Sequence, residues 1–341
     1  MIAKPLFAFV FAALPLAAPV RAGVQNAGSL LVFPVFDNSP GSTSIVSVTN
    51  TNGDAVTGQV RVHFVYVNGS NCQEFDRVRT LTPNDTITVL TKYDNPNQTQ
   101  GYLYCFALNK LTGAATKFDY LVGTEIVGTA SDALDTETQP FVFRAGNGLA
   151  EGANTDLDGD GIRDLNGNEY EPAPNRILVP NFIASTNEIG NKLVLINLTG
   201  GAAFTASVGF EVYNDNEEIY SGQYSFSCWT KVDLLSVSNV FANWFLKSTN
   251  HNPNEIEGTN DLAPETGWFR LNGLTASSST TTFSDPAILA MRLTQVVGRP
   301  NLGIQGLGSG IANDGFAALP YGEGTQTNGD LLPHGTQGDG N

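Results

Sequence analysis

Residues 59–68 read QVRVHFVYVN, and residues 205–214 read TASVGFEVYN. In the first stretch, one face of an extended chain carries the apolar side chains of Val60, Val62, Phe64 and Tyr66. The second stretch alternates in the same way, and both are rich in β-branched and aromatic residues. A period of two with this composition predicts half-buried β-strands.

The two stretches belong to a longer internal repeat. Four further pairs of segments match in the same order, namely 31–36 with 177–182, 44–53 with 192–201, 101–108 with 267–274, and 124–128 with 294–298. Five ordered matches predict a duplicated module. We place the first copy at 28–148 and the second at 174–300, with 149–173 as the segment between them.

Turn signals such as Asn52-Gly53 and Asn68-Gly69 separate the short apolar stretches of each copy. Frequent turns between alternating strands are typical of an antiparallel sandwich. The fold class predicted is therefore all-β, with two homologous antiparallel β-sandwich modules in tandem, one short helix in the second module and an extended C-terminal tail.

The helix is expected at 236–248, where apolar residues recur with helical spacing. These residues are Val237, Val240, Phe241, Trp244 and Phe245. The tail, 301–341, is rich in glycine and lacks lysine and arginine, which predicts a flexible segment. The alternative for this tail is that it adds a strand to a neighbouring subunit.

The N-terminus has the layout of a secretory leader. Lys4 precedes an apolar run that is short for a membrane span of roughly 20 residues, and Val20-Arg21-Ala22 offers small residues at a cleavage position. We expect cleavage after Ala22, no membrane insertion afterwards, and a protein that is secreted or held at the cell surface.

Removal of the leader takes away the cations Lys4 and Arg21, so the formal charge falls from −16 to −18. A chain this acidic lacks the basic surface that phosphate backbones require, which argues against nucleic acid as a partner. The partners expected are a surface polymer, a glycan or other subunits.

Export permits disulfides, but the chain has three cysteines. Cys72 and Cys105 share the first module and are the expected pair. Cys228 is interpreted as a buried, inert thiol.

The segment between the modules is strongly acidic. Residues 154–171 read NTDLDGDGIRDLNGNEYE, and Arg163 is the one basic residue among seven acidic residues from Glu151 to Glu171. Alternating Asp156, Asp158 and Asp160, followed by Gly161, suit an oxygen ring around a hard cation, because alternate side chains converge on one point and a glycine permits the sharp turn. The main-chain carbonyl of Ile162 would complete the pattern.

These residues resemble the DxDxDG loops of EF-hand-like proteins, and more closely the DxDxDGxxD repeats of thrombospondin type 3. The resemblance implies Ca²⁺ binding by Asp156, Asp158, Asp160 and Asp164. Position twelve, where an EF-hand has a bidentate glutamate, is Gly167, so Asn166, Asn168 or Glu169 is expected to close the coordination shell. The predicted metal ligands are Asp156, Asp158, Asp160, Ile162, Asp164, Asn166 and Glu169.

The remaining chemistry is sparse. His63, His251 and His334 share no metal-ligand spacing, and there is no nucleophile elbow or phosphate loop. The segments LVFPVFDN (31–38) and LTPNDTITVLT (81–91) are similar to uncharacterised secreted bacterial proteins, a resemblance that implies no functional residue. The sequence therefore predicts a non-enzymatic, calcium-stabilised structural or adhesive protein whose acidic segment acts as a hinge that calcium stiffens. The alternatives are a carbohydrate-binding protein that uses Trp229, Trp244 or Trp268, and a secreted hydrolase.

Overall fold

The computed structural model describes residues 26–129, 134–174, 176–249 and 264–296, together with four short strand segments beyond residue 313. The expected leader lies outside these residues. Within the described part of the chain, no helix combines the length and the apolar character needed to cross a membrane. The described residues form antiparallel sheets with a few short helices, which confirms the predicted all-β class.

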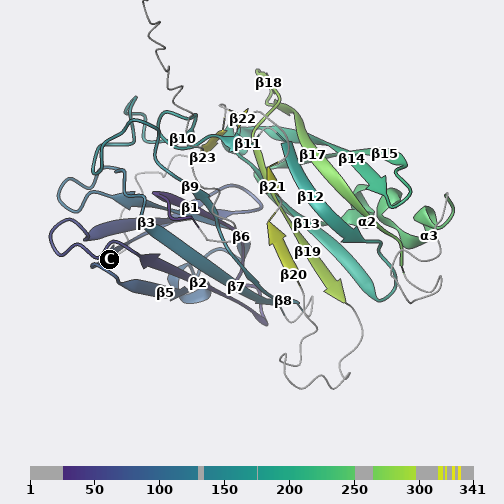
Figure 1. Ribbon diagram of the computed structural model, residues 1–341, viewed down its shortest axis with the longest axis horizontal. Helices are drawn as coiled ribbons and strands as arrows, with labels where there is room; N and C mark the ends of the chain where they lie inside the picture. Colours follow the sequence, from purple (N-terminus) through teal and green to yellow (C-terminus); the bar gives the residue numbers. More distant parts are fainter. Residues whose placement is uncertain are drawn as a thin grey trace, which may run out of the picture.

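The first sandwich consists of two sheets (Figure 1). One has the strand order β4-β3-β6-β1-β9, formed by Glu74–Leu81, Val60–Asn68, Gln100–Leu108, Leu30–Asp37 and Phe141–Phe143. The other has the order β5-β2-β7-β8, formed by Thr86–Leu90, Ser42–Asn50, Leu121–Thr129 and Leu134–Thr138. A helical turn, α1 (Thr91–Asp94), follows β5. Phe33, Val46 and Phe64 belong to the apolar core between these sheets.

The second sandwich repeats this plan. One sheet has the order β15-β14-β17-β12-β21, formed by Ile219–Ser227, Thr205–Asn214, Thr266–Ser277, Arg176–Ile183 and Leu319–Pro320, with β18 (Thr282–Ser284) paired to β17. The other has the order β16-β13-β19-β20, formed by Trp229–Asp233, Ile189–Asn197, Ile288–Val296 and Asp314–Ala317. A single 3₁₀ turn, η1 (Gly201–Ala203), precedes β14. Val179, Leu193 and Phe210 belong to the core between these sheets.

The two sandwiches share one topology. The order β4-β3-β6-β1 corresponds to β15-β14-β17-β12, and β5-β2-β7 corresponds to β16-β13-β19. The register of β1 against β6 shifts between Phe33 and Phe36, and that of β12 against β17 shifts between Val179 and Phe182. An equivalent irregularity at Pro34 and at Pro180 is a detail that two copies of one module would share.

Two of the five sequence matches are displaced from this equivalence. Asn50 and Asn197 end the equivalent strands β2 and β13, so equivalent residues of these strands are 147 positions apart. The match of 44–53 with 192–201 sets them 148 positions apart, which is one residue too many. The match of 124–128 with 294–298 is wrong by three residues, because Leu121 and Ile288 lie opposite those two asparagines. A one-residue slip exchanges the two faces of a strand, so only the structural register places the core residues correctly.

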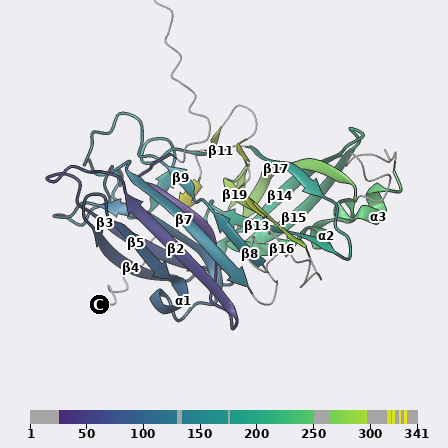
Figure 2. The ribbon, with the colours of Figure 1, turned by 60° about the horizontal axis from the view of Figure 1, so that its bottom comes forward.

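The two sandwiches pack face to face, and four sheets are stacked in succession (Figures 1 and 2). The sheet that contains β6 and β1 lies against the sheet that contains β13 and β19, and a third apolar core fills the space between them. Every residue of β1 is buried, because both faces of this strand are covered.

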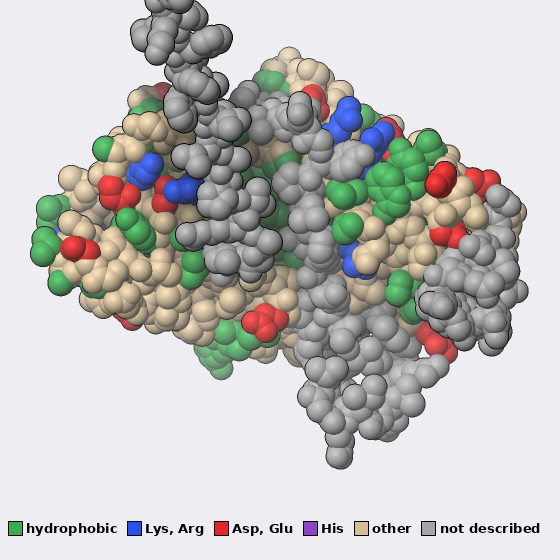
Figure 3. Space-filling model, in the orientation of Figure 1, with side chains coloured by type: hydrophobic (Ala, Val, Ile, Leu, Met, Phe, Trp, Pro, Cys, Tyr) green, Lys and Arg blue, Asp and Glu red, His purple; other side chains and the backbone are tan. Residues whose placement is uncertain are grey.

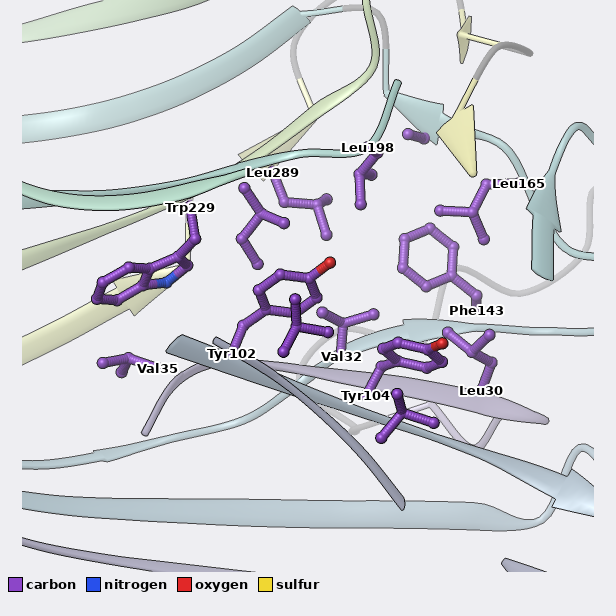
Figure 4. Close-up of a cluster of buried hydrophobic side chains, with 14 of the residues drawn as sticks. Leu30, Val32, Val35, Tyr102, Tyr104, Phe143, Leu165, Leu198, Trp229 and Leu289 are labelled. Carbon is purple, nitrogen blue, oxygen red and sulfur yellow. The ribbon is translucent and has the colours of Figure 1, made fainter. Parts of the chain in front are cut away.

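The core between the sandwiches combines large side chains from both modules. Tyr102 extends from β6 toward Leu289 of the second module, and Tyr104 lies near Leu30 and Phe143 in the same core (Figure 4). Trp229 Nε1 donates a hydrogen bond of 2.8 Å to the carbonyl of Pro34. A Cβ atom at Gly69 would lie 2.3 Å from Trp229 Cε3, so the first module needs glycine at this turn for the indole to fit.

An ion pair and a disulfide accompany this core. Lys231 Nζ lies 3.3 Å from Asp37 Oδ2, and both side chains are buried or nearly so. A disulfide joins Cys72 to Cys228 across the interface, and Cys105 is the free, buried cysteine. The expected pairing of Cys72 with Cys105 is therefore wrong. Cys105 points into the core of the first sandwich, whereas Cys72 lies in the turn that faces the second.

The hinge interpretation of the acidic segment is also wrong. A shared apolar core and a disulfide already hold the two modules together. Leu165, Tyr170 and Ala173 of the acidic segment belong to that same core. The segment is thus a packed part of the junction, and a bound cation would stiffen the loop itself.

The predicted helix at 236–248 is instead three short pieces. They are α2 (Leu234–Val237), η2 (Asn239–Phe241) and α3 (Asn243–Leu246). Ser238 and Ala242 adopt extended conformations between the pieces, and the Ser238 side chain accepts the N–H of Val240. Phe241 is fully buried, but the Trp244 side chain is 65% exposed and lies outside the core that helical periodicity predicts for it.

The C-terminal tail adds strands to its own chain. β20 pairs with β19, and β21 pairs with β12. Two shorter pairs join β22 (Thr325–Gln326) to β11 (Ala173–Pro174) and β23 (Gly329–Leu331) to β10 (Arg163–Leu165). A flexible tail is therefore the wrong description for these segments, and the strand addition that was considered for a neighbouring subunit occurs within one molecule.

A buried carboxyl in the first sandwich predicts a pH dependence of stability. Glu125 on β7 is fully buried, and this burial raises its pKa well above 4.5. The folded state retains this proton where the unfolded state releases it, so stability decreases as the pH rises above about 4.5. We expect Glu125→Gln to remove this dependence, worth about 1.4 kcal/mol per pH unit between the two pKa values. Urea unfolding at pH 5 and pH 8 measures it.

Glu137→Gln provides the matched control, because Glu137 lies on the adjacent strand β8 and is exposed. It should leave the pH profile of the wild type unchanged. Equal pH profiles for wild type and Glu125→Gln would contradict the assignment.

Candidate metal centre

The acidic segment is anchored to the first sandwich at both ends. Thr155 N–H donates to the carbonyl of Ala115, and Gly146 N–H donates to the carbonyl of Glu169. A buried hydrogen bond of 2.8 Å joins the hydroxyl groups of Thr155 and Tyr170. These contacts bring 155–157 next to 169–170, so side chains twelve or more residues apart in sequence meet in one loop.

Successive turns give the loop its shape. Asp156 Oδ1 accepts the N–H of Gly159 at 3.0 Å, and Asp160 Oδ1 accepts the N–H of Ile162 at 2.8 Å. Gly161 has a φ of +83°, which is the sharp turn after the third aspartate that the sequence predicts.

Three predicted ligands converge. One carboxylate oxygen from each of Asp156, Asp158 and Glu169 lies within 4.8 Å of the other two. Of Asn166, Asn168 and Glu169, the three residues expected to close the coordination shell, Glu169 is the one whose side chain joins the two aspartates. Its Oε1 accepts the N–H of Leu157 at 2.5 Å, and its Oε2 accepts the N–H of Asp164 at 3.2 Å.

The other predicted ligands lie around this cluster but are not part of it. The Asp160 side chain is exposed. Asp164 Oδ2 accepts a hydrogen bond of 3.1 Å from the Asn166 side-chain amide, and Asn166 Oδ1 accepts the N–H of Glu169. Asn166 thus positions Glu169. Coordination by Asp160, Asp164, Asn166 or the carbonyl of Ile162 stays a prediction.

The electrostatics of the loop favour a cation. Burial raises the pKa of Asp164, and the nearby carboxylates of Asp160 and Asp158 raise it further. Burial likewise raises the pKa of Glu169. A bound cation would reverse both effects, because an opposite charge favours the ionised carboxyl. The donors are all hard oxygens, which suit Ca²⁺ and not a thiophilic metal.

Arg163 has a structural role that the sequence analysis does not predict. Its guanidinium lies 3.1 Å from Asp156 Oδ2 and 5.1 Å from the centre of the Phe106 ring, and the side chain is 2% exposed. Arg163 therefore neutralises Asp156 from the interior, while Asp158 is exposed on the other side of the cluster. Its position as the single basic residue among seven acidic residues is the sequence signal that indicates such a role.

The residues considered for other chemistry occupy separate places. His63 is buried on β3, with Nε2 3.8 Å from Asp76 Oδ1. His251 and His334 lie outside the described residues. Trp229 is a buried interface residue. Trp268 corresponds to Tyr102 but is only partly buried. Tyr102 packs into the core between the two sandwiches, whereas the described residues place no sheet against the equivalent face of the second module.

The fold and the loop together define an all-β protein of four stacked antiparallel sheets with a carboxylate cluster at the junction of its two sandwiches. No family model matches the chain, and no curated protein matches it. Among solved structures, the apo form of Pleurotus ostreatus lectin aligns over 93% of this chain and 88% of its own, with 10% identity and a TM-score of 0.15. A likeness of this size carries no argument about function.

Proposed function

We propose that this chain is a calcium-stabilised, non-enzymatic structural or adhesive protein that acts outside a bacterial cell or on its surface. The observation that carries the proposal is the convergence of Asp156, Asp158 and Glu169 in a loop that packs into the junction of the two sandwiches. Oxygen ligands at this spacing suit Ca²⁺, and binding to the folded state alone stabilises it.

Two further observations support the extracellular part of the proposal. The N-terminal sequence has the layout of a cleavable leader. The Cys72–Cys228 disulfide is a bond that persists in oxidising compartments. A cross-linked stack of sheets with a cation in its junction suits a structural or adhesive role.

Calcium titration of the mature protein tests the proposal. We expect the free energy of unfolding to rise by about 1.4 kcal/mol at a tenfold excess of Ca²⁺ over its Kd. Small-angle scattering should show little change, because the shared core fixes the two sandwiches without the ion. The affinity should fall as the pH approaches the raised pKa values of Asp164 and Glu169, because protons compete for the same oxygens.

A pair of variants makes the test specific. Asp158→Asn retains the Oδ1 atom that accepts the N–H of Asp160 but removes the charge, so it should abolish most of the calcium effect. Asp54→Asn is the matched control, because Asp54 Oδ1 also accepts backbone N–H groups in an exposed turn and Asp54 is not part of the cluster. If calcium stabilises wild type and Asp158→Asn equally, this site is not the one that binds it.

A further inference from the structure

The outer face of the sheet β15-β14-β17-β12-β21 is the counterpart of a face that is covered in the first module. Leu30, Val65, Tyr104 and Phe106 belong to the core between the sandwiches. The register pairs Leu30 with Phe106 and Val65 with Tyr104. The equivalent pairs in the second module are Arg176 with Asn272 and Glu211 with Arg270.

These replacements convert an apolar packing face into a polar one. A second copy of the chain that repeated the first interface would bury these charges, which costs more than apolar burial returns. The face is therefore unsuited to head-to-tail stacking of sandwiches, and its polar groups point to a different occupant.

A groove of about 190 Å³ crosses this face. It is lined by residues of four adjacent strands, among them Ser221, Gly209, Asn272 and Arg176. Gly209 leaves the floor low, where the equivalent residue of the first module is His63. Four strands at about 4.8 Å spacing give a groove about 14 Å long, which suits a short stretch of a linear polymer.

The groove offers both donors and acceptors. Arg270 and Glu211 line it, with Arg270 Nε donating to Glu211 Oε2 at 2.6 Å, and the hydroxyl of Tyr213, which lies beside the groove, donates to the same oxygen at 3.2 Å. Arg176 and Asn272 add further polar groups. Hydroxyl groups both donate and accept hydrogen bonds, so this mixture matches a ligand rich in hydroxyls.

An aromatic pair lies beside the groove. The rings of Tyr213 and Trp268 are stacked with centroids 4.1 Å apart and planes 4° apart. Both side chains are partly exposed, and basic and hydrophobic side chains lie next to one another over β14 and β17 (Figure 3). A flat apolar surface next to hydrogen-bonding groups is the combination on which a ligand with apolar faces and polar edges binds.

We infer that this groove binds a neutral glycan chain. The ion pair of Arg270 with Glu211 compensates its own charge, and the chain as a whole carries −16, which repels polyanions over long range. A neutral polyhydroxylated polymer needs no uncompensated charge in the groove and is not repelled by the negative charge of the protein. The inference gives the adhesive part of the proposed function a ligand class, and it does not depend on the calcium loop.

An array of neutral gluco-, manno-, xylo- and galacto-oligosaccharides tests the inference, with polygalacturonate as the anionic probe. We expect binding to at least one neutral series. Gly209→Tyr should weaken it at least tenfold, because the ring would fill the groove and needs only the flexible Leu274 side chain to move, 3.2 Å from the new Cβ. Arg176→Ala should weaken glycan binding severalfold. Because the Arg176 side chain is exposed, this variant should fold normally and keeps the test valid if Gly209→Tyr does not fold.

Trp244→Ala is the matched control, because Trp244 is an exposed aromatic residue outside the groove, and it should leave binding unchanged. The inference is overturned if no neutral oligosaccharide binds, if binding is confined to polygalacturonate, or if Gly209→Tyr and Arg176→Ala bind as the wild type does. Concentration-dependent self-association blocked by Gly209→Tyr would also overturn it. The calcium-induced rise in stability should persist in both groove variants, so the two proposals fail separately.

Discussion

Replacement of both Cys72 and Cys228 by alanine should lower the free energy of unfolding by about 5 kcal/mol. The bond closes a loop across a sequence separation of 156 residues, and the entropy that a cross-link removes from the unfolded chain grows with the length of that loop. The folded state loses little by comparison, because the apolar core between the sandwiches remains. The double variant should therefore still fold, with a much lower denaturation midpoint.

Urea unfolding of wild type and double variant measures this loss, and thiol counting identifies the bond. In denaturant without reductant, one thiol should react, namely Cys105, and all three should react after reduction. In the native state Cys105 should be inert, because burial raises its pKa and shields the sulfur. Cys105→Ala is the control, with a cost limited to a small cavity. A cross-linked peptide that contains Cys72 and Cys105 would refute the assignment.

The strands were predictable because their signal is local. Alternation in 59–68 and 205–214 corresponds to β3 and β14, whose apolar faces line the two sandwich cores. The helical pattern of 236–248 was misleading, since a spacing of four residues also arises when Val237, Phe241 and Phe245 pack against one core from three separate turns. Periodicity reports which side chains are buried and leaves the backbone path open.

The repeat does not reveal that the two sandwiches are stacked, although β1 and β6 carry a sequence signal for this arrangement. β1 and β6 are apolar on both faces, as in Leu31-Val32-Phe33, and a continuous apolar strand indicates cover on both sides. The cysteine pairing depends on that stacking, because Cys72 and Cys228 meet only at the interface. Proximity in sequence favoured Cys105, but its alternating position in β6 turns it toward the opposite sheet.

The carboxylate cluster was predictable in part for a similar reason. The spacing of Asp156 and Asp158 is local, and a turn at Gly161 follows from residue type. The approach of Glu169 requires the segment 155–170 to fold back on itself, which the Thr155–Tyr170 hydrogen bond and the packing of Leu165 achieve. These contacts involve the body of the protein, so loop spacing alone leaves the closing ligand open.

Trp229→Ala is expected to cost about 3–5 kcal/mol of unfolding free energy, the usual range for removing a buried tryptophan. The Trp229 side chain is 8% exposed, and its indole fills the space above Gly69 of the other module. The variant would leave a cavity in the core between the sandwiches and remove the hydrogen bond to the carbonyl of Pro34. Because that core joins both modules, the wild type should unfold in one calorimetric transition, and the variant should broaden or split it.

Trp244→Ala is the matched control, since it removes the same side chain from a position that is 65% exposed in the same module. Its effect should stay within about 0.5 kcal/mol, as for surface substitutions away from special features. A comparable loss in the two variants would mean that tryptophan removal destabilises the second sandwich wherever it occurs. Two transitions in the wild type would mean that each sandwich is stable alone, and the interface would then contribute little beyond the disulfide. A large, selective loss in Trp229→Ala is therefore the result that identifies the junction as the centre of stability.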